Sequence, residues 1–214
     1  MANPQEKIEG GRELDRIVFF SDAVFAIAIT LLVLSIEVPE IPANLVAEEL
    51  PGRLLDLQPD ILSYVLRFLV ILSFWMAHHS IFRLVKRYDR GLIWLNSLFL
   101  MCIAFLPFPT HLLGDYADQQ LVVGIYAGSL AVTRLLLTAV WWYASGKHRL
   151  VDEGLDAGTI RAFRIRGLVI PLIFFSSIAI SFLSVWAAIF SWVLLLVGDL
   201  MLLRLLRRQP ENVS

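Results

Sequence analysis

The chain has 214 residues, of which 58% are hydrophobic and 17% charged, and its formal net charge is −1. A soluble domain contains about 45–50% apolar and about 25% charged residues, so this composition indicates a membrane protein. The single cysteine, Cys102, excludes an internal disulfide and a cysteine-based metal cluster. We find no zinc-ligand spacing, phosphate-binding loop, serine nucleophile elbow or nucleic-acid-binding motif. We therefore expect no enzyme activity, no metal site, no cofactor and no nucleic-acid partner.

Apolar segments long enough to cross a bilayer, which takes about 20 residues as a helix, follow one another along the chain. The first, residues 17–36, ends before the helix breakers Pro39 and Pro42. The last block, Gly167–Leu206, is too long for one helix, so we expect a hairpin that turns near Ser181–Ser184. The expected fold is an all-α, polytopic helix bundle in which residues 1–214 form one domain with six transmembrane helices: about 17–36, 61–82, 92–113, 121–144, 167–183 and 185–206.

The distribution of lysine and arginine predicts how this bundle is oriented, because positively charged loops stay on the cytoplasmic side. Nearly all of the 18 basic residues lie on one side of the expected spans: Lys7, Arg12, Arg16, Arg83, Lys86, Arg87, Arg90, Lys147, Arg149, Arg161, Arg164, Arg166, Arg204, Arg207 and Arg208. The opposite side holds Arg53 among acidic residues such as Glu48, Glu49 and Asp115. We expect both termini in the cytoplasm, which agrees with an even number of spans, and the protein in the inner (plasma) membrane.

The first span contains one polar pair, Ser21 and Asp22, within the otherwise apolar sequence FFSDAVFAIAITLLVL of residues 19–34. A helix advances about 100° per residue. On such a helix, six residues fall within about 60° of the line through Ile27 and form a stripe: Phe20, Ala23, Ile27, Thr30, Leu31 and Leu34. Asp22 falls about 140° away from that line. The stripe can face lipid or a neighbouring helix, whereas Asp22 is expected to point into the protein, where it needs polar partners.

Four short motifs in the first half of the chain resemble those of one family. They are RxxxFSD at residues 16–22, WxxHH at 75–79, WxN at 94–96 and FLPFPT at 105–110. Over about residues 12–113, the chain resembles the prokaryotic branch of the lysosomal potassium channel family, transmembrane protein 175. Beyond that region, the resemblance depends on hydropathy and on the number of spans.

This resemblance implies a potassium-permeable cation channel without a TVGYG selectivity filter, a sequence that does not occur here. It implies a homotetramer in the lipid bilayer, with a central pore for monovalent cations that is lined by the first helix of each subunit. The matching pore-lining positions are Ile27, Thr30, Leu31 and Leu34. A ring of apolar side chains can close a pore by steric block and by dewetting. We therefore expect a hydrophobic constriction at these residues, through which K⁺ passes.

The motif residues are expected to brace the first helix rather than to bind ions. The candidates for the partner of Asp22 are His78 or His79, Asn96 and the indole N–H of Trp75, and the sequence leaves the choice open. A metal site is disfavoured, because His78 and His79 point about 100° apart on a helix. The complete expected network is Arg16, Phe20, Ser21, Asp22, Trp75, His78, His79 and Asn96.

Other functions remain open from the sequence alone. A secondary ion transporter is the main alternative, although such proteins often contain internal repeats and none occurs here. A membrane-embedded enzyme and a non-conducting assembly protein are further alternatives. Inside the spans, Arg67 and Arg134 need partners, for which Asp199 is a candidate. The Gly124-x-x-x-Gly128 pair indicates helix packing, either within or between subunits.

Overall fold

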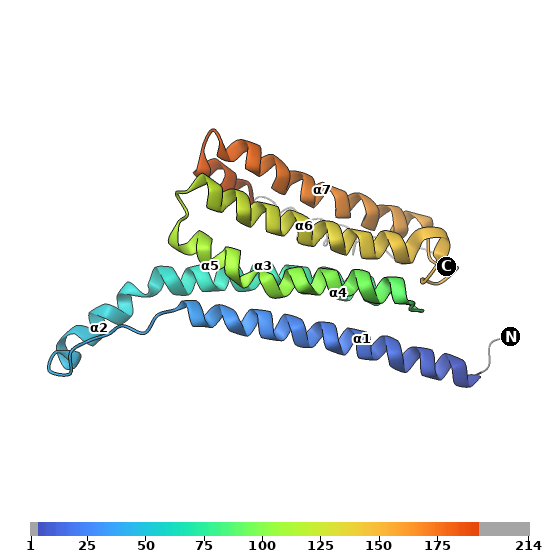
Figure 1. Ribbon diagram of the computed structural model, residues 1–214, viewed down its shortest axis with the longest axis horizontal. Coiled ribbons are helices and arrows are strands. Elements are labelled where there is room, and N and C mark those ends of the chain that lie inside the picture. The colour runs from blue at the N-terminus through green and yellow to red at the C-terminus, as the bar shows by residue number, and fades with distance from the viewer. Residues whose placement is uncertain (1–3, 193–214) are drawn as a thin grey trace, which may run out of the picture.

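The computed structural model describes residues 4–192, and helices make up most of them. In chain order, the elements are α1 (Pro4–Leu31), the 3₁₀ turn η1 (Leu32–Ser35), α2 (Val46–Asp56), α3 (Gln58–Phe82), α4 (Arg90–Phe105), α5 (Pro107–Asp115), α6 (Gln120–Ser145), the 3₁₀ turn η2 (Gly146–His148) and α7 (Ala157–Ser181). Figure 1 shows the long helices running roughly side by side, with α1 at one edge next to α3 and α4, and with α7 at the opposite edge. The helix α2 projects beyond the end of this bundle.

Five helical stretches in the described part of the chain are long and apolar enough to cross a membrane: Gly11–Ser35, Gln58–Phe82, Arg90–Asp115, Gln120–His148 and Ala157–Ser181. The chain turns after Ser181, and a further helix occupies residues 185–192. The rest of the expected sixth span, residues 193–206, lies outside the described residues, as does Asp199. The all-α, multi-pass architecture is therefore confirmed, whereas six spans per chain stays a prediction.

The expected third span, residues 92–113, is not one continuous helix. It consists of α4 and α5, which meet at Leu106. Pro107 has no N–H group with which to continue α4, but it fits the first position of α5, where no intrahelical donor is needed. The proline-rich segment therefore divides the span without taking it out of the membrane, because α4 and α5 together still form one apolar stretch.

Three further boundaries differ from the expectation. The first helix begins at Pro4 rather than near residue 17. The fifth begins at Ala157 rather than near residue 167, because the Asp156 side chain caps it by accepting a hydrogen bond from the Thr159 N–H at 2.8 Å. The helix α2 occupies a segment for which no helix was expected. Glutamates in its first turn favour a helical N-terminus, and none of its side chains is buried.

The helix α6 forms the centre of the packed core, between α4 and α7. Its alanines at 127, 131 and 144 are fully buried, and such small residues let neighbouring helices in a membrane approach closely. The buried Trp141 donates its indole N–H to the Ile160 carbonyl of α7 at 3.3 Å. The polar atom of this large side chain is therefore satisfied within the core.

The helices α6 and α7 approach each other closely at Gly167. The Thr138 hydroxyl donates to the Gly167 carbonyl at 2.8 Å, and a Cβ atom on Gly167 would lie only 2.7 Å from two Thr138 side-chain atoms. By contrast, a Cβ on Gly124 or Gly128 would meet no described atom within 4 Å. The Gly124-x-x-x-Gly128 pair therefore does not pack closely against the described part of its own chain.

At the end of the bundle where α1 begins (Figure 1), Asp89 joins three segments. Its carboxylate caps α4 by accepting the Leu92 N–H at 2.9 Å, and it also accepts the Tyr143 hydroxyl of α6 at 2.9 Å. Arg149 donates to the same carboxylate, with Nη2 at 3.0 Å. Partial burial by itself raises the pKa of the Asp89 carboxyl. The hydrogen bonds from Leu92 and Tyr143 and the charge of Arg149 outweigh this and hold the pKa below its usual value.

We expect Gly167→Ala to lower the apparent melting temperature of the protein in detergent, because the new methyl group must push α7 away from Thr138. Overpacking of this kind costs about 1–3 kcal/mol. Gly124→Ala is the matched control, since its methyl group enters open space and alanine is the better helix former. Equal melting temperatures for the two variants would contradict the close approach at Gly167.

We expect Asp89→Asn to be less stable than the wild type at neutral pH. The pKa of Asp89 is lowered in the folded protein, so its contribution is fully present above the unfolded value of about 3.9 and is lost as the pH falls through the lower, folded value. The difference in melting temperature between the two proteins should therefore shrink as the pH falls below about 4. Asp15→Asn, at an exposed position on α1, controls for the loss of one charge. A pH-independent difference would contradict this account.

Candidate functional site

The helix α1 has two faces that differ sharply in burial. Ser21, Phe25, Ala28 and Leu32 form the inner face and are at most 3% exposed. The stripe expected from the sequence forms the opposite face, and all of its members are exposed: Phe20, Ala23, Ile27, Thr30, Leu31 and Leu34. Among the expected pore-lining residues, Leu34 is 75% exposed and Ile27 60% exposed. Within one chain, this apolar stripe therefore has no covering helix among the described elements.

A buried network of polar side chains links α1 to α3 and α4. The amide nitrogen of Asn96 donates to the Ser21 hydroxyl at 3.0 Å, and Ser21 donates in turn to the Ile17 carbonyl at 2.8 Å. The other end of the amide, Oδ1, lies 3.0 Å from Nε2 of His78. Because an amide oxygen only accepts hydrogen bonds, this ring nitrogen of His78 is the donor. The amide of Asn96 on α4 thus bonds to α1 through its nitrogen and to α3 through its oxygen.

Aromatic rings surround the His78 side chain. Its centroid lies 4.2 Å from that of Phe82, 5.6 Å from that of Phe99 and 5.7 Å from that of Phe25, and all four side chains are buried. This packing fixes the imidazole plane and excludes water from it. A histidine held in this way positions the Asn96 amide, which in turn positions Ser21 on α1.

The partner of Asp22 is Trp75, whose indole N–H donates to the carboxylate at 2.8 Å. The His79 ring stacks on Trp75, with 5.4 Å between the ring centroids. Two residues of the expected network lie apart from this cluster. Arg16 is exposed and pairs with Glu13 of its own helix at 2.7 Å. Phe20 belongs to the exposed stripe and is 61% exposed. Within the described residues, no cluster of three acidic, histidine or cysteine side chains could hold a metal ion.

A contact that the sequence did not suggest fixes the other end of α1. Arg67 of α3 donates from Nη1 to the Ser35 hydroxyl at 3.1 Å, and Ser35 donates to the Leu32 carbonyl at 2.8 Å. These bonds hold the 3₁₀ turn η1, which carries Leu34. The only signal in the sequence was that an arginine inside a span needs a partner, and this did not identify Ser35.

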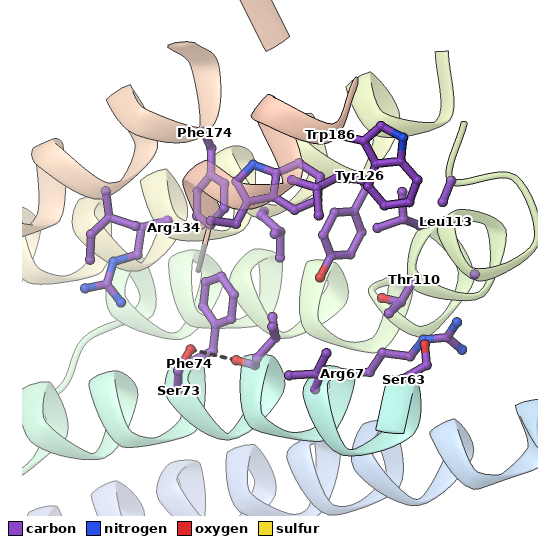
Figure 2. Close-up of a pocket in the computed structure, with 18 residues that line it drawn as sticks. Ser63, Arg67, Ser73, Phe74, Thr110, Leu113, Tyr126, Arg134, Phe174 and Trp186 are labelled. Carbon is purple, nitrogen blue, oxygen red and sulfur yellow. Dashed lines mark hydrogen bonds between the residues drawn. The ribbon is translucent and has the colours of Figure 1, made fainter. Parts of the chain in front are cut away.

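Arg67 also lines a cavity of about 350 Å³ between α3, α5, α6, α7 and the helical residues 185–192. Figure 2 shows this cavity, with Tyr126 pointing into it and Arg67 lying along its edge beside Ser63 and Thr110. Most of the lining is apolar: Leu66, Val70, Phe74, Leu113, Ala117, Leu130, Ile170, Phe174, Trp186, Ile189 and Trp192. No sequence motif marks it, because its walls come from segments far apart in the chain.

The residues of α1, α3 and α4 that make these contacts lie in a part of the chain that matches a known family model. The model described as the endosomal/lysosomal potassium channel TMEM175 matches residues 16–107. A potassium channel of Chamaesiphon minutus is 37% identical over 182 residues, which cover 83% of this chain and 88% of that one. The chain belongs to the TMEM175 family.

Two further comparisons agree with this membership. A potassium channel of Streptomyces collinus is 37% identical over 180 residues, covering 80% of this chain and 84% of that one. The crystal structure of a lysosomal potassium-selective channel TMEM175 homologue from Chamaesiphon minutus has a TM-score of 0.73 and 34% identity, and it covers 89% of this chain and 97% of that chain. TMEM175 proteins are ion channels, so the alternative of a membrane-embedded enzyme does not apply.

We expect Asn96→Leu to destabilise the protein in detergent, because it leaves the buried groups of Ser21 and His78 without their shared partner. Each unsatisfied buried group costs about 1–3 kcal/mol. Ser97→Leu introduces the same side chain at an exposed neighbouring position of α4 and serves as the control. The apparent melting temperature measures both. A similar melting temperature for the two variants would show that the network contributes little to stability.

Proposed function

We propose that four copies of this chain form a potassium-permeable channel whose central pore is lined by α1 of each subunit. The observation that carries this proposal is the exposed stripe of α1, in which Ile27, Leu31 and Leu34 are 60%, 45% and 75% exposed. Membership in a family of ion channels supports it. The relatives from Chamaesiphon minutus and Streptomyces collinus, both named potassium channels, support K⁺ as the permeating ion.

The position of α1 at the edge of the bundle suits a pore-lining role (Figure 1). Its polar residues Ser21 and Asp22 are engaged by the helices behind it, so the helix cannot rotate without breaking those bonds. The stripe therefore keeps one direction, away from its own subunit. If four such stripes surround one axis, each stripe is covered by the other three, and its apolar surface is then no longer exposed.

The stripe supplies an apolar constriction with one polar position. Rings of Ile27, Leu31 and Leu34 close the pore by steric block and dewetting, and they conduct only when they widen enough to admit water. The Thr30 hydroxyl donates to the Ile27 carbonyl at 2.9 Å, which leaves the lone pairs of its oxygen free to accept. Four Thr30 hydroxyls would therefore offer oxygen ligands to a partly dehydrated cation between the apolar rings.

We further propose that both termini lie in the cytoplasm and that the protein resides in the plasma membrane. The excess of basic residues at the N-terminal end of α1 and in the 83–90 and 147–166 segments supports this orientation. At the other end, α2 carries Glu48 and Glu49. Negative charge on the outer side raises the local concentration of cations near the pore entrance, which fits a cation channel.

We expect Ile27→Ala to increase cation flux or reduce the preference for K⁺ over Na⁺, because it widens the apolar ring. The protein is reconstituted in K⁺-loaded liposomes, and flux is followed with a pH-sensitive dye and a protonophore, with K⁺ or Na⁺ outside. Ile165→Ala removes the same atoms from a 52% exposed isoleucine of α7 and should conduct like the wild type.

The oligomer is measured on the same samples by native mass spectrometry, where the proposal requires tetramers. Intact tetramers without protein-dependent flux in any variant would overturn the channel proposal. Flux that saturates at transporter-like turnover would favour a secondary transporter. Identical flux and selectivity in Ile27→Ala and Ile165→Ala would place the constriction elsewhere.

A further inference from the structure

Arg67 is a half-buried cation inside a membrane-spanning helix, and its guanidinium has N–H groups available to donate further hydrogen bonds. Nη1 donates to the Ser35 hydroxyl, and a Cβ atom on Gly114 would collide with Nη2, so the glycine lets the guanidinium lie against α5. No carboxylate of the described residues forms an ion pair with Arg67. Asp115, whose Oδ2 lies 3.7 Å from Nε2 of His111, and Asp60 act on Arg67 by charge but form no ion pair with it. A charge at membrane depth is costly unless it is closely paired, so this position favours an anion in direct contact with the guanidinium.

The cavity beside Arg67 is polar near this residue and apolar over most of its remaining wall. Ser63, Thr110 and Tyr126 line it together with Arg67, and Ser73 and a second arginine, Arg134, also belong to its lining. Figure 2 shows the Tyr126 hydroxyl pointing across the cavity towards α3, which carries Arg67. The apolar walls include the buried Leu130 and Phe174. A volume of about 350 Å³ lies within the roughly 300–1,000 Å³ of small-molecule sites.

We propose that this cavity binds a single-chain amphiphile with an anionic carboxylate or phosphate head. The head lies at Arg67, where a guanidinium can make two parallel hydrogen bonds to a carboxylate or a phosphate. The alkyl chain lies among Val70, Leu130 and Phe174. A neutral amphiphile fits the apolar walls equally well but leaves the guanidinium without its counter-charge.

The ligand can enter from the membrane. Leu66 and Trp186 both line the cavity, and they are 51% and 62% exposed on the outside of the chain. The cavity therefore reaches the exposed surface of the described chain, and we expect this surface to border lipid, where amphiphiles are concentrated. Entry by this route does not pass through the pore.

The test is a thermal-stability titration of the purified full-length protein in a neutral detergent. Lauric acid represents a free fatty acid, lauroyl lysophosphatidic acid represents a lipid phosphate head, and lauryl alcohol and lauroyl lysophosphatidylcholine carry the same chain without net charge. A ligand that binds only the folded protein raises its melting temperature with concentration. We expect one or both anionic amphiphiles to stabilise the wild type and the uncharged pair to do so at least tenfold less potently. The anionic amphiphile that stabilises the protein shows whether the site takes a fatty acid or a lipid phosphate.

Variants separate the site from general detergent effects. Arg67→Leu should abolish stabilisation by the anionic amphiphile, whereas Arg53→Leu, at an exposed arginine of α2, should retain it. Val70→Phe leaves Arg67 in place but fills the cavity, so it should also abolish binding. If Arg67→Leu fails to fold, Val70→Phe and a count of bound ligand by native mass spectrometry decide the question. Equal stabilisation of all variants, equal potency of the uncharged analogues, or no stabilisation of the wild type would overturn the proposal.

Discussion

The amide of Asn96 determines which side of α1 faces the rest of the chain. A helix in a bilayer gains little from turning one apolar face inward rather than another, because lipid tails are as apolar as leucine. Polar side chains remove this freedom, since each one left without a partner in hydrocarbon is costly. Ser21 must therefore face Asn96 of α4, and Asp22 must face Trp75 of α3. The stripe with Ile27 then points outward as a consequence, although it makes none of these bonds.

The attachment of α1 is uneven along its length, and this has a consequence for gating. Hydrogen bonds hold it near Ser21 and again at Ser35 in the 3₁₀ turn. Between these points, Phe25, Ala28 and Leu32 pack against the neighbouring helices by apolar contact alone. Apolar contacts are not directional, so small sideways shifts of this segment break no hydrogen bond to another helix. Ile27 and Leu31 lie in this segment, so the proposed apolar ring could widen or close at low cost.

The sequence predicted the features that depend on hydrophobic length and local pattern. It predicted a multi-pass helical membrane protein, the apolar stripe of α1, though not what covers it, and an inward-facing Asp22 with Trp75 among its candidate partners. It did not distinguish Trp75 from the histidines, because that choice depends on the packing of His78 among three phenylalanines. It also joined α4 and α5 across Pro107, since hydropathy does not register a missing N–H donor. The contact of Arg67 with Ser35 and the cavity depend on tertiary structure alone.

Arg67 connects two parts of the molecule that are otherwise separate. One nitrogen of its guanidinium holds the turn that carries Leu34, and the same side chain lines the cavity between α3, α5 and α6. An anion bound in the cavity attracts the guanidinium towards itself and competes with the neutral Ser35 hydroxyl, because charge-assisted hydrogen bonds are about twice as strong as neutral ones. The turn that follows α1, η1, is a 3₁₀ helix, whose hydrogen-bond geometry is poorer than that of an α-helix. Loss of the bond from Arg67 would therefore act on this weaker turn at the end of the proposed pore helix, at the level of Leu34.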